Sequence, residues 1–224
     1  PGQEQPTPGT DAINELSDTQ KAAVRLALGE WENVANLNFI EVSETGNDVG
    51  TFRFGFTDYD HPSAAAWAIM PTTSPEGGNV WIQQDSYSYD YTQGTGYGFA
   101  LLLHEIGHAL GLKHPFEGSP QLSTALDKTT YSVMSYTNDS NVYSGSDYVV
   151  SSTPMVLDIA AIQHLYGAAV HNNGDTTYTY SPATAFAETI WDSGGTDTLN
   201  IENFTVACDV DLTPGASSTI AISG

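Results

Sequence analysis

Residues 104–114 read HEIGHALGLKH, a pattern of the form His-Glu-x-x-His-x-x-Gly-x-x-His. Residues four positions apart lie on one face of a helix, so His104 and His108 can direct their imidazole nitrogens at one metal ion. Glu105 is displaced around the helix from both histidines. It can therefore reach a metal-bound water without occupying a coordination position, as a general base must.

The second half of the pattern supplies a turn and a third ligand. Gly111 can adopt the left-handed conformation that ends a helix, which turns the chain back and brings His114 to the ion. Three histidines leave a fourth position for water, which predicts a catalytic zinc site rather than a structural one. Five fixed positions would occur by chance in roughly one such chain in ten thousand, which disfavours the alternative of an apolar helix with three unrelated histidines.

The composition indicates a folded and strongly acidic protein. Apolar residues make up 40% of the chain and aromatic residues 11%, which is typical of a globular protein. Five basic residues stand against 27 acidic ones, for a net charge of −22. Such a chain should repel nucleic acids and anionic membranes, so neither is expected as a partner. Two readings of the charge remain open: solubility in a salty medium, or carboxylates that hold calcium.

Two isolated residues receive structural rather than functional interpretations. Cys208 is the only cysteine and cannot form an internal disulfide. It shares one face of an expected strand with Val206, Val210 and Leu212, while Asp209 and Asp211 take the other face, which predicts a small buried side chain. Lys113, between the zinc motif's last two positions, is expected to be solvated. No segment is long and apolar enough to span a membrane.

Helical and strand patterns in the sequence predict the secondary structure of the rest of the chain. Ser17 and Gln20 form a capping box at the start of the first expected helix. The expected helices cover residues 17–35, 98–110 and 154–166. The expected strands cover residues 37–42, 51–56, 63–70 and 79–83. From about residue 170 the chain becomes rich in Thr, Asp, Gly and Ser, with short alternating strands. We therefore expect a flexible lead-in (1–14), a catalytic domain (15–170) and a separate C-terminal segment (171–224).

Several stretches together resemble the serralysin family of metzincin zinc proteases, which are secreted bacterial peptidases. The family's zinc signature is similar to HEIGHALGLKHP at residues 104–115, and its Met-turn to SVMSY at residues 132–136. Residues 158–168 and 20–36 resemble the closing and opening helices of the catalytic domain. The resemblance implies an α+β metzincin protease domain with a twisted mixed sheet, a zinc-site helix, a closing helix and a short C-terminal β segment.

The resemblance also implies roles for individual residues. Tyr136 would be a fifth zinc ligand that moves away when substrate binds and then stabilises the oxyanion. Met134 would form an apolar floor beneath the histidines, although ordinary core packing would explain a methionine equally well. Ala66, Trp67 and Ala68 would lie in the edge strand that pairs with a substrate peptide. The alternative is an exposed edge strand without a binding role.

Serralysins continue into a calcium-binding β-roll, and the resemblance implies the start of a truncated one in residues 171–224. The positions implied as calcium ligands are Asn172, Gly174, Thr176, Asp192, Gly194, Gly195 and Asp197. An arginine is usual in the family where this chain has Asn172. Because the chain stops where the calcium-binding repeats should begin, we expect it to be a truncated or self-trimmed catalytic part.

Together these features predict a secreted, extracellular, monomeric endopeptidase that cleaves proteins or peptides. It would hold one catalytic Zn²⁺ and one or more structural Ca²⁺. One alternative is a calcium-stabilised binding or adhesion module that has lost catalysis. Another is a metzincin of a different subfamily, which Tyr136 and the absence of paired cysteines disfavour.

Overall fold

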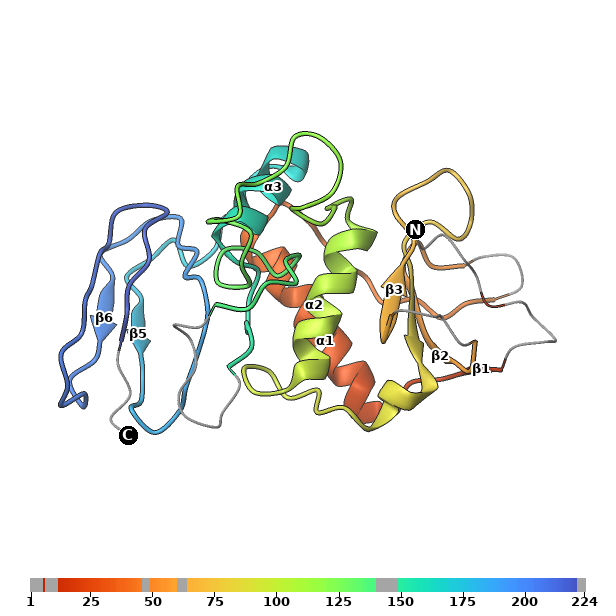
Figure 1. Ribbon diagram of the computed structural model, residues 1–224, viewed down its shortest axis with the longest axis horizontal. Coiled ribbons are helices and arrows are strands. Elements are labelled where there is room, and N and C mark those ends of the chain that lie inside the picture. Colours follow the sequence, from red (N-terminus) through yellow and green to blue (C-terminus); the bar gives the residue numbers. More distant parts are fainter. Residues whose placement is uncertain (1–5, 7–11, 46–48, 60–63, 140–148, 221–224) are drawn as a thin grey trace.

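The computed structural model describes residues 6, 12–45, 49–59, 64–139 and 149–220. The helices are α1 (Asp18–Val34), α2 (Tyr97–Ala109) and α3 (Val156–Tyr166), with a 3-10 turn η1 (Gln84–Ser88). The strands are β1 (Ile13–Asn14), β2 (Arg53–Thr57), β3 (Ala66–Ala68), β4 (Asn79–Gln83), β5 (Thr177–Thr179) and β6 (Thr198–Asn200). In Figure 1, α1 and α2 occupy the centre, with the sheet β1–β4 on one side and the strands β5 and β6 at the opposite end.

The sheet is mixed, as predicted, and its strand order is β1-β2-β4-β3. Strands β2 and β4 are parallel, and β3 pairs antiparallel with β4, so that Trp67 lies opposite Trp81. This order places β3 at the edge of the described sheet, where the sequence predicted an edge strand. The strand is shorter than the expected range 63–70, of which residue 63 lies outside the described part.

Two predictions about the N-terminal half were wrong. Ile13 and Asn14, assigned to the lead-in, pair with β2 as strand β1. Residues 37–42, predicted to be a strand, run as an extended segment along α1 instead. Glu32 accepts a hydrogen bond from the backbone N–H of Phe39, so a side chain of α1 takes a donor that a strand would give to the sheet.

Helix α1 begins as the capping box predicts. The Ser17 side chain accepts a hydrogen bond from the backbone N–H of Gln20, and the Gln20 side chain accepts one from the backbone N–H of Ser17. Trp31 is fully buried where α1 packs against α2. Helix α1 thus packs against α2, the helix of the zinc motif, and holds it in place.

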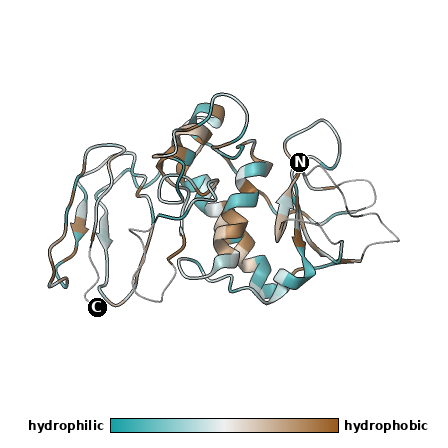
Figure 2. Cartoon of the chain, viewed as in Figure 1, coloured by the Kyte–Doolittle hydropathy of each residue, from teal (hydrophilic) through white to brown (hydrophobic). Residues whose placement is uncertain are grey.

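Helix α2 is buried over most of its surface and is predominantly apolar (Figure 2). Phe99, Leu103 and Ile106 are all 0% exposed. Gly107 faces the side chains of Met134 and Trp31 so closely that an added Cβ would lie 2.5 Å from Met134 Sδ. The helix that carries two of the histidines is therefore fixed by close packing on both of these neighbours.

The C-terminal segment forms a second, smaller sheet in which β5 and β6 are parallel. It is not cleanly separated at residue 170, because residues 187–191 return to the catalytic part. Ser152 donates its backbone N–H to Ala187 O at 3.0 Å. The indole N–H of Trp191 donates to Ala169 O at 3.1 Å.

The prediction of a buried Cys208 was wrong. Residues 206–208 form no strand, and Asp209 makes only an isolated bridge with Thr219. Cys208 is half-buried, while its predicted apolar companion Leu212 is 78% exposed. Alternation alone could not bury these side chains, since no second layer covers them among the described residues. None of the described helices combines the length and apolar character that a membrane crossing requires.

Gly107→Ala should lower the free energy of unfolding by about 1–3 kcal/mol, because the new methyl group overpacks the Met134–Trp31 contact. Gly29 is the matched control. It lies inside α1 with no neighbouring atom within 4 Å of an added Cβ. Gly29→Ala should therefore stabilise the protein by about 0.5–1 kcal/mol through helix propensity. Urea unfolding measures both, and equal effects of the two substitutions would contradict the packing argument.

Candidate metal centre

The three motif histidines converge on one point. Helix α2 carries His104 and His108, and Gly111 adopts a φ of +106° that turns the chain so that His114 faces them. His114 Nε2 lies 3.2 Å from His104 Nε2 and 3.1 Å from His108 Nε2. A tetrahedral zinc with Zn–N bonds of about 2.0–2.1 Å separates its ligand nitrogens by about 3.3–3.4 Å. The described trio therefore fits a zinc ion, as predicted.

The other ring nitrogen of each helical histidine faces a carbonyl oxygen. His104 Nδ1 lies 2.8 Å from Val133 O, and His108 Nδ1 lies 2.7 Å from Leu112 O. A carbonyl can only accept, so these contacts assign the proton to Nδ1 and leave each Nε2 lone pair available for a metal. Burial lowers the pKa of His104 to about 3 and that of His108 to about 4, which keeps both imidazoles neutral.

His114 has a different partner. Its Nδ1 lies 3.0 Å from Glu117 Oε2, although the geometry of this contact is not that of a hydrogen bond. Glu117 was not among the predicted site residues. Its place in the sequence, an acidic residue in a turn three positions after the last motif histidine, could have indicated a partner for His114.

Glu105 is fully buried between α2 and the edge strand. Burial raises the pKa of its carboxyl to about 8, opposed by a hydrogen bond from the backbone N–H of Ala68. Its Oε2 has no hydrogen-bond partner among the described residues. One carboxyl oxygen is thus anchored to β3, and the other is left for a group that enters the site. A cation held nearby would favour the ionised form of this carboxyl.

Tyr136 lies against the histidines, as the resemblance implied. Its ring stacks on His104 with centroids 5.5 Å apart and lies 4.6 Å from the centroid of His114. The side chain is 67% exposed, and its partial burial raises the pKa of the phenol to about 12. A neutral phenol can donate a hydrogen bond, so the group has the chemistry that oxyanion stabilisation needs.

The Met-turn is held by a carboxylate that the sequence analysis assigned only to the closing helix. Asp158 is fully buried and accepts hydrogen bonds from Ser132 Oγ at 2.6 Å, Val133 N at 2.7 Å and Met155 N at 2.8 Å. Val133 in turn presents its carbonyl to His104. Asp158 therefore orients a zinc-motif histidine through one intervening residue. Met134 is 1% exposed beside α2, where a floor residue should be.

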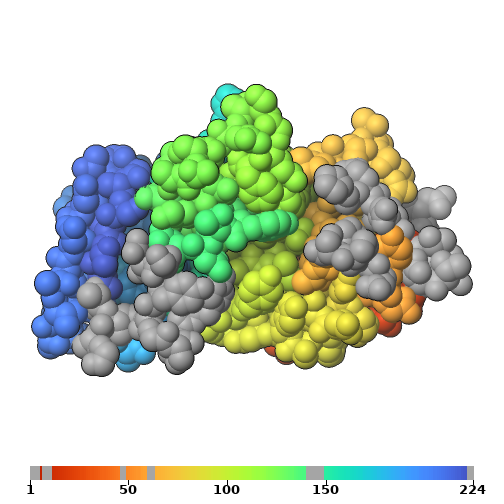
Figure 3. All heavy atoms as spheres, viewed as in Figure 1, coloured from red at the N-terminus to blue at the C-terminus, as the bar shows by residue number. Residues whose placement is uncertain are grey.

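A cavity of about 400 Å³ lies beside the histidines. Its lining includes Ala66 of β3, His104, Glu105 and Leu101 of α2, and Tyr136. Ala68 reaches this site through its backbone contact with Glu105, whereas Trp67 packs with Ile69 and Trp81 in a separate small cluster. Figure 3 shows the segment around residues 115–135 between the sheet and the C-terminal part of the molecule.

Comparison with known proteins identifies the family. A family model described as Matrixin matches residues 10–167. The chain is 35% identical over 95% of its length to "Metallopeptidase AprA" of Pseudomonas marginalis, covering 50% of that protein. It is 32% identical over 92% of its length to "Serralysin" of Photorhabdus laumondii and to "Serralysin B" of Dickeya chrysanthemi, covering 48% of each. The chain belongs to the matrixin family, as a serralysin-type metzincin.

This serralysin-type metzincin spans about half the length of the relatives it matches. The mixed α+β fold described above is consistent with the catalytic domain of this family. The metzincin fold predicted from the sequence is therefore confirmed.

The residues implied as calcium ligands lie on two loops that the structure places side by side. Thr176 donates its backbone N–H to Asp197 Oδ1 at 3.0 Å. Gly195 lies so close to the other loop that an added Cβ would be 2.5 Å from Gly174 O. Asp192 Oδ2 accepts from the Tyr178 hydroxyl at 2.7 Å. The two loops thus meet, and calcium binding by these residues, by Asn172 and by Gly194 stays a prediction.

Asp158→Ala should lower the free energy of unfolding by at least about 3 kcal/mol. It leaves one hydroxyl and two buried backbone N–H groups without an acceptor, and each such loss costs about 1–3 kcal/mol. Asp158→Asn should cost less, because its amide oxygen can still accept. Urea unfolding checks this, with the exposed Asp209→Ala as control. A loss for Asp158→Ala no larger than that of the control would refute the anchoring role.

The metal-free Glu105→Gln variant should be more stable than the metal-free parent, by a margin that grows with pH. The folded-state pKa of Glu105, about 8, is raised above the reference value of 4.5. The neutral carboxyl is therefore favoured in the fold, and stability present below pH 4.5 is lost as the pH rises toward 8. Glutamine does not ionise. The difference should grow by at most on the order of 1 kcal/mol per pH unit in this window, measured by denaturant unfolding with a chelator present. A difference in stability between the two proteins that does not change with pH would contradict this prediction.

Proposed function

We propose that this protein is a secreted zinc-dependent endopeptidase that hydrolyses peptide bonds of extracellular proteins. The observation that carries the proposal is the site itself. Three imidazoles direct their Nε2 atoms at one point, and the Glu105 oxygen that lacks a hydrogen-bond partner among the described residues belongs to the same α2 turn. The family membership supports a metallopeptidase, and the printed names of its relatives are those of metalloproteases.

The chemistry divides between the metal and the protein. A zinc ion held by His104, His108 and His114 would lower the pKa of a water molecule and polarise the scissile carbonyl. Glu105 takes the proton of the attacking water and passes it to the leaving amine. The backbone N–H of Ala68 holds the carboxylate of Glu105 in place during both transfers. The phenol of Tyr136 donates a hydrogen bond to the oxyanion that develops at the carbonyl.

The substrate side of the proposal rests on β3 and the cavity. An extended peptide would pair antiparallel with residues 66–68, which form the outer strand of the described sheet. A substrate side chain would enter the cavity of about 400 Å³ between Ala66, Leu101 and Tyr136. We further propose a monomer that holds one catalytic Zn²⁺ and one or more structural Ca²⁺ at the two C-terminal loops.

Glu105→Gln tests the proposal most directly. It should retain zinc and the fold, and lower kcat/KM on a fluorogenic peptide by about 10²–10⁴-fold, because the general base is lost. Adding a chelator to the parent protein should abolish cleavage, and adding zinc back should restore it. Glu202→Gln, an exposed substitution in the C-terminal segment, is the control and should cleave normally.

The inactive binding-module alternative makes the opposite prediction. A zinc-loaded parent protein that cleaves neither casein nor a peptide library would favour that alternative over the endopeptidase.

Tyr136→Phe should lower kcat by on the order of 10²-fold and change KM little, because the phenol acts on the transition state rather than on the bound substrate. Steady-state kinetics on the same peptide measure the effects on kcat and on KM separately. An unchanged kcat would remove the phenol from the mechanism, and a rise in KM alone would assign Tyr136 to substrate binding.

A further inference from the structure

His114 is held differently from the other two histidines. His104 and His108 belong to α2, and backbone carbonyls fix their rings. His114 follows the helix in a loop, so no helical hydrogen bonds determine its direction. Its ring must be positioned by the residues that come after it. Those residues form a short closed loop, residues 115–122, and two of its side chains contact the His114 ring.

The loop closes through backbone and side-chain hydrogen bonds. Glu117 donates its backbone N–H to His114 O at 3.1 Å, and Leu122 donates its own to Pro115 O at 2.9 Å. The Gln121 side chain donates to Phe116 O. These bonds form one turn directly after the ligand and a second closure at the far end. The first residues of the loop therefore have little freedom relative to His114.

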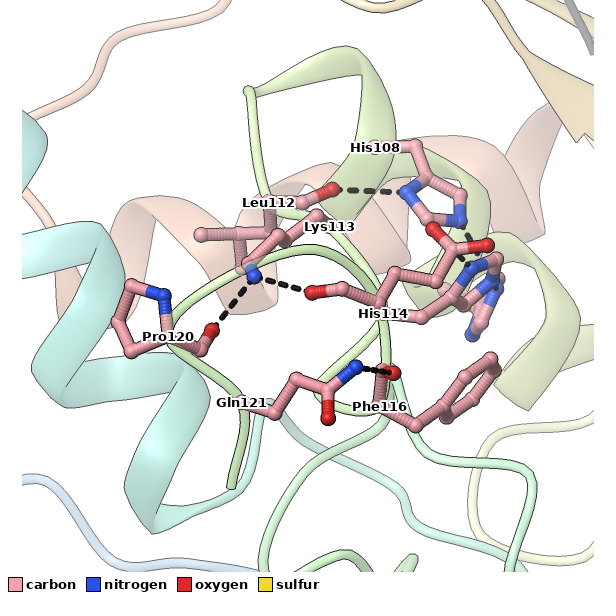
Figure 4. Close-up of polar contacts among 9 residues, drawn as sticks. His108, Leu112, Lys113, His114, Phe116, Pro120 and Gln121 are labelled. Carbon is pink, nitrogen blue, oxygen red and sulfur yellow. Dashed lines mark hydrogen bonds and ion pairs between the residues drawn. The ribbon is translucent and has the colours of Figure 1, made fainter. Parts of the chain in front are cut away.

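Lys113 fixes the loop from its other side. Its ammonium group donates to Glu117 O and, at 2.7 Å, to Pro120 O (Figure 4). Lys113 is exposed, as predicted, but it is not merely solvated, because its ammonium group makes these two hydrogen bonds. A charge-assisted hydrogen bond to a carbonyl is stronger than a neutral one. The two bonds from Lys113 join the residue before His114 to the segment three to six positions after it.

Two side chains of the loop then contact the ring of His114. Phe116 stacks on it with centroids 4.9 Å apart and planes 8° from parallel. Glu117 places Oε2 at 3.0 Å from Nδ1, the ring nitrogen that faces away from the metal point. A carboxylate on the far nitrogen orients an imidazole ligand and raises its basicity.

We propose that Lys113, Phe116 and Glu117 form a clamp that positions His114, with Glu117 as the residue that sets how tightly the site holds zinc. The inference rests on the proposed zinc site and deepens it. Glu117 touches neither substrate nor the reacting atoms, so it is a positioning residue. Lys113 acts one step further away, since it holds the backbone from which the Glu117 side chain projects.

Zinc affinity tests the proposal without reference to proteolysis. Glu117→Ala should weaken zinc binding by about 10–100-fold in a chelator-competition titration, because the carboxylate partner of His114 is lost. Glu117→Gln keeps an oxygen that can accept from Nδ1 and should recover most of the affinity. Circular dichroism should show both variants folded. A folded Glu117→Ala that binds zinc as tightly as the parent would overturn the role of Glu117.

Lys113→Met tests the second step. It keeps the length of the side chain and removes both hydrogen bonds to the loop, so it should also weaken zinc binding. Because Lys113 acts through Glu117, the double variant should bind zinc no more than about 2–3-fold more weakly than Glu117→Ala alone. Fully additive losses would show that the two residues act independently and would overturn the clamp.

Cobalt supplies a readout that a general loss of stability would not change. Cobalt bound to the parent site should give visible absorption bands that depend on its ligands, and Glu117→Ala should shift that spectrum, whereas the control Glu202→Gln should not. If zinc binds the parent tightly but no peptide is cleaved, the endopeptidase proposal fails and the clamp survives. If the parent binds no zinc at all, both proposals fail. An unshifted cobalt spectrum in Glu117→Ala would overturn the clamp alone.

Discussion

The site depends on holding three imidazole nitrogens within about one metal-ligand spacing of each other. His114 Nε2 lies 3.1–3.2 Å from its two counterparts. Burial keeps His104 and His108 neutral, and an oxygen acceptor at each Nδ1 leaves Nε2 free to bind. Once these conditions are met, the fold needs only to supply a general base and a route for substrate.

The rest of the catalytic part can be understood as support for those rings. Helix α2 is fixed because Gly107 allows Met134 and Trp31 to approach it closely. The carbonyl that orients His104 belongs to Val133, whose own N–H is held by the buried Asp158 of α3. The closing helix thus contributes to the metal centre although none of its residues faces a metal. A chain of short, buried hydrogen bonds transmits position over this distance more reliably than apolar packing would.

Sequence reasoning succeeded where a feature is local. The histidines, Glu105 and Gly111 lie within eleven residues, and the geometry of one helix and one turn brings them together. It failed where the outcome depends on distant neighbours. Residues 37–42 have the composition of a strand, but the Glu32 side chain of α1 accepts the N–H of Phe39. Cys208 shares a face with apolar residues in the sequence pattern, but no second layer covers that face among the described residues. Asp158 lies 25 positions from Val133 in sequence, so no local pattern could reveal their contact.

The scarcity of basic residues makes Lys113 informative. The chain has five Lys and Arg residues, and all of them lie in the described part. Lys21, Arg25, Arg53 and Lys128 each pair with a carboxylate. Lys113 instead gives its hydrogen bonds to two backbone carbonyls beside the metal centre, although 27 acidic residues compete for it. Exposed ion pairs contribute little to stability. Lys113 forms no such pair with any described residue and instead binds the loop that follows His114. We therefore attribute its hydrogen bonds to the positioning of His114 rather than to the charge balance of the protein.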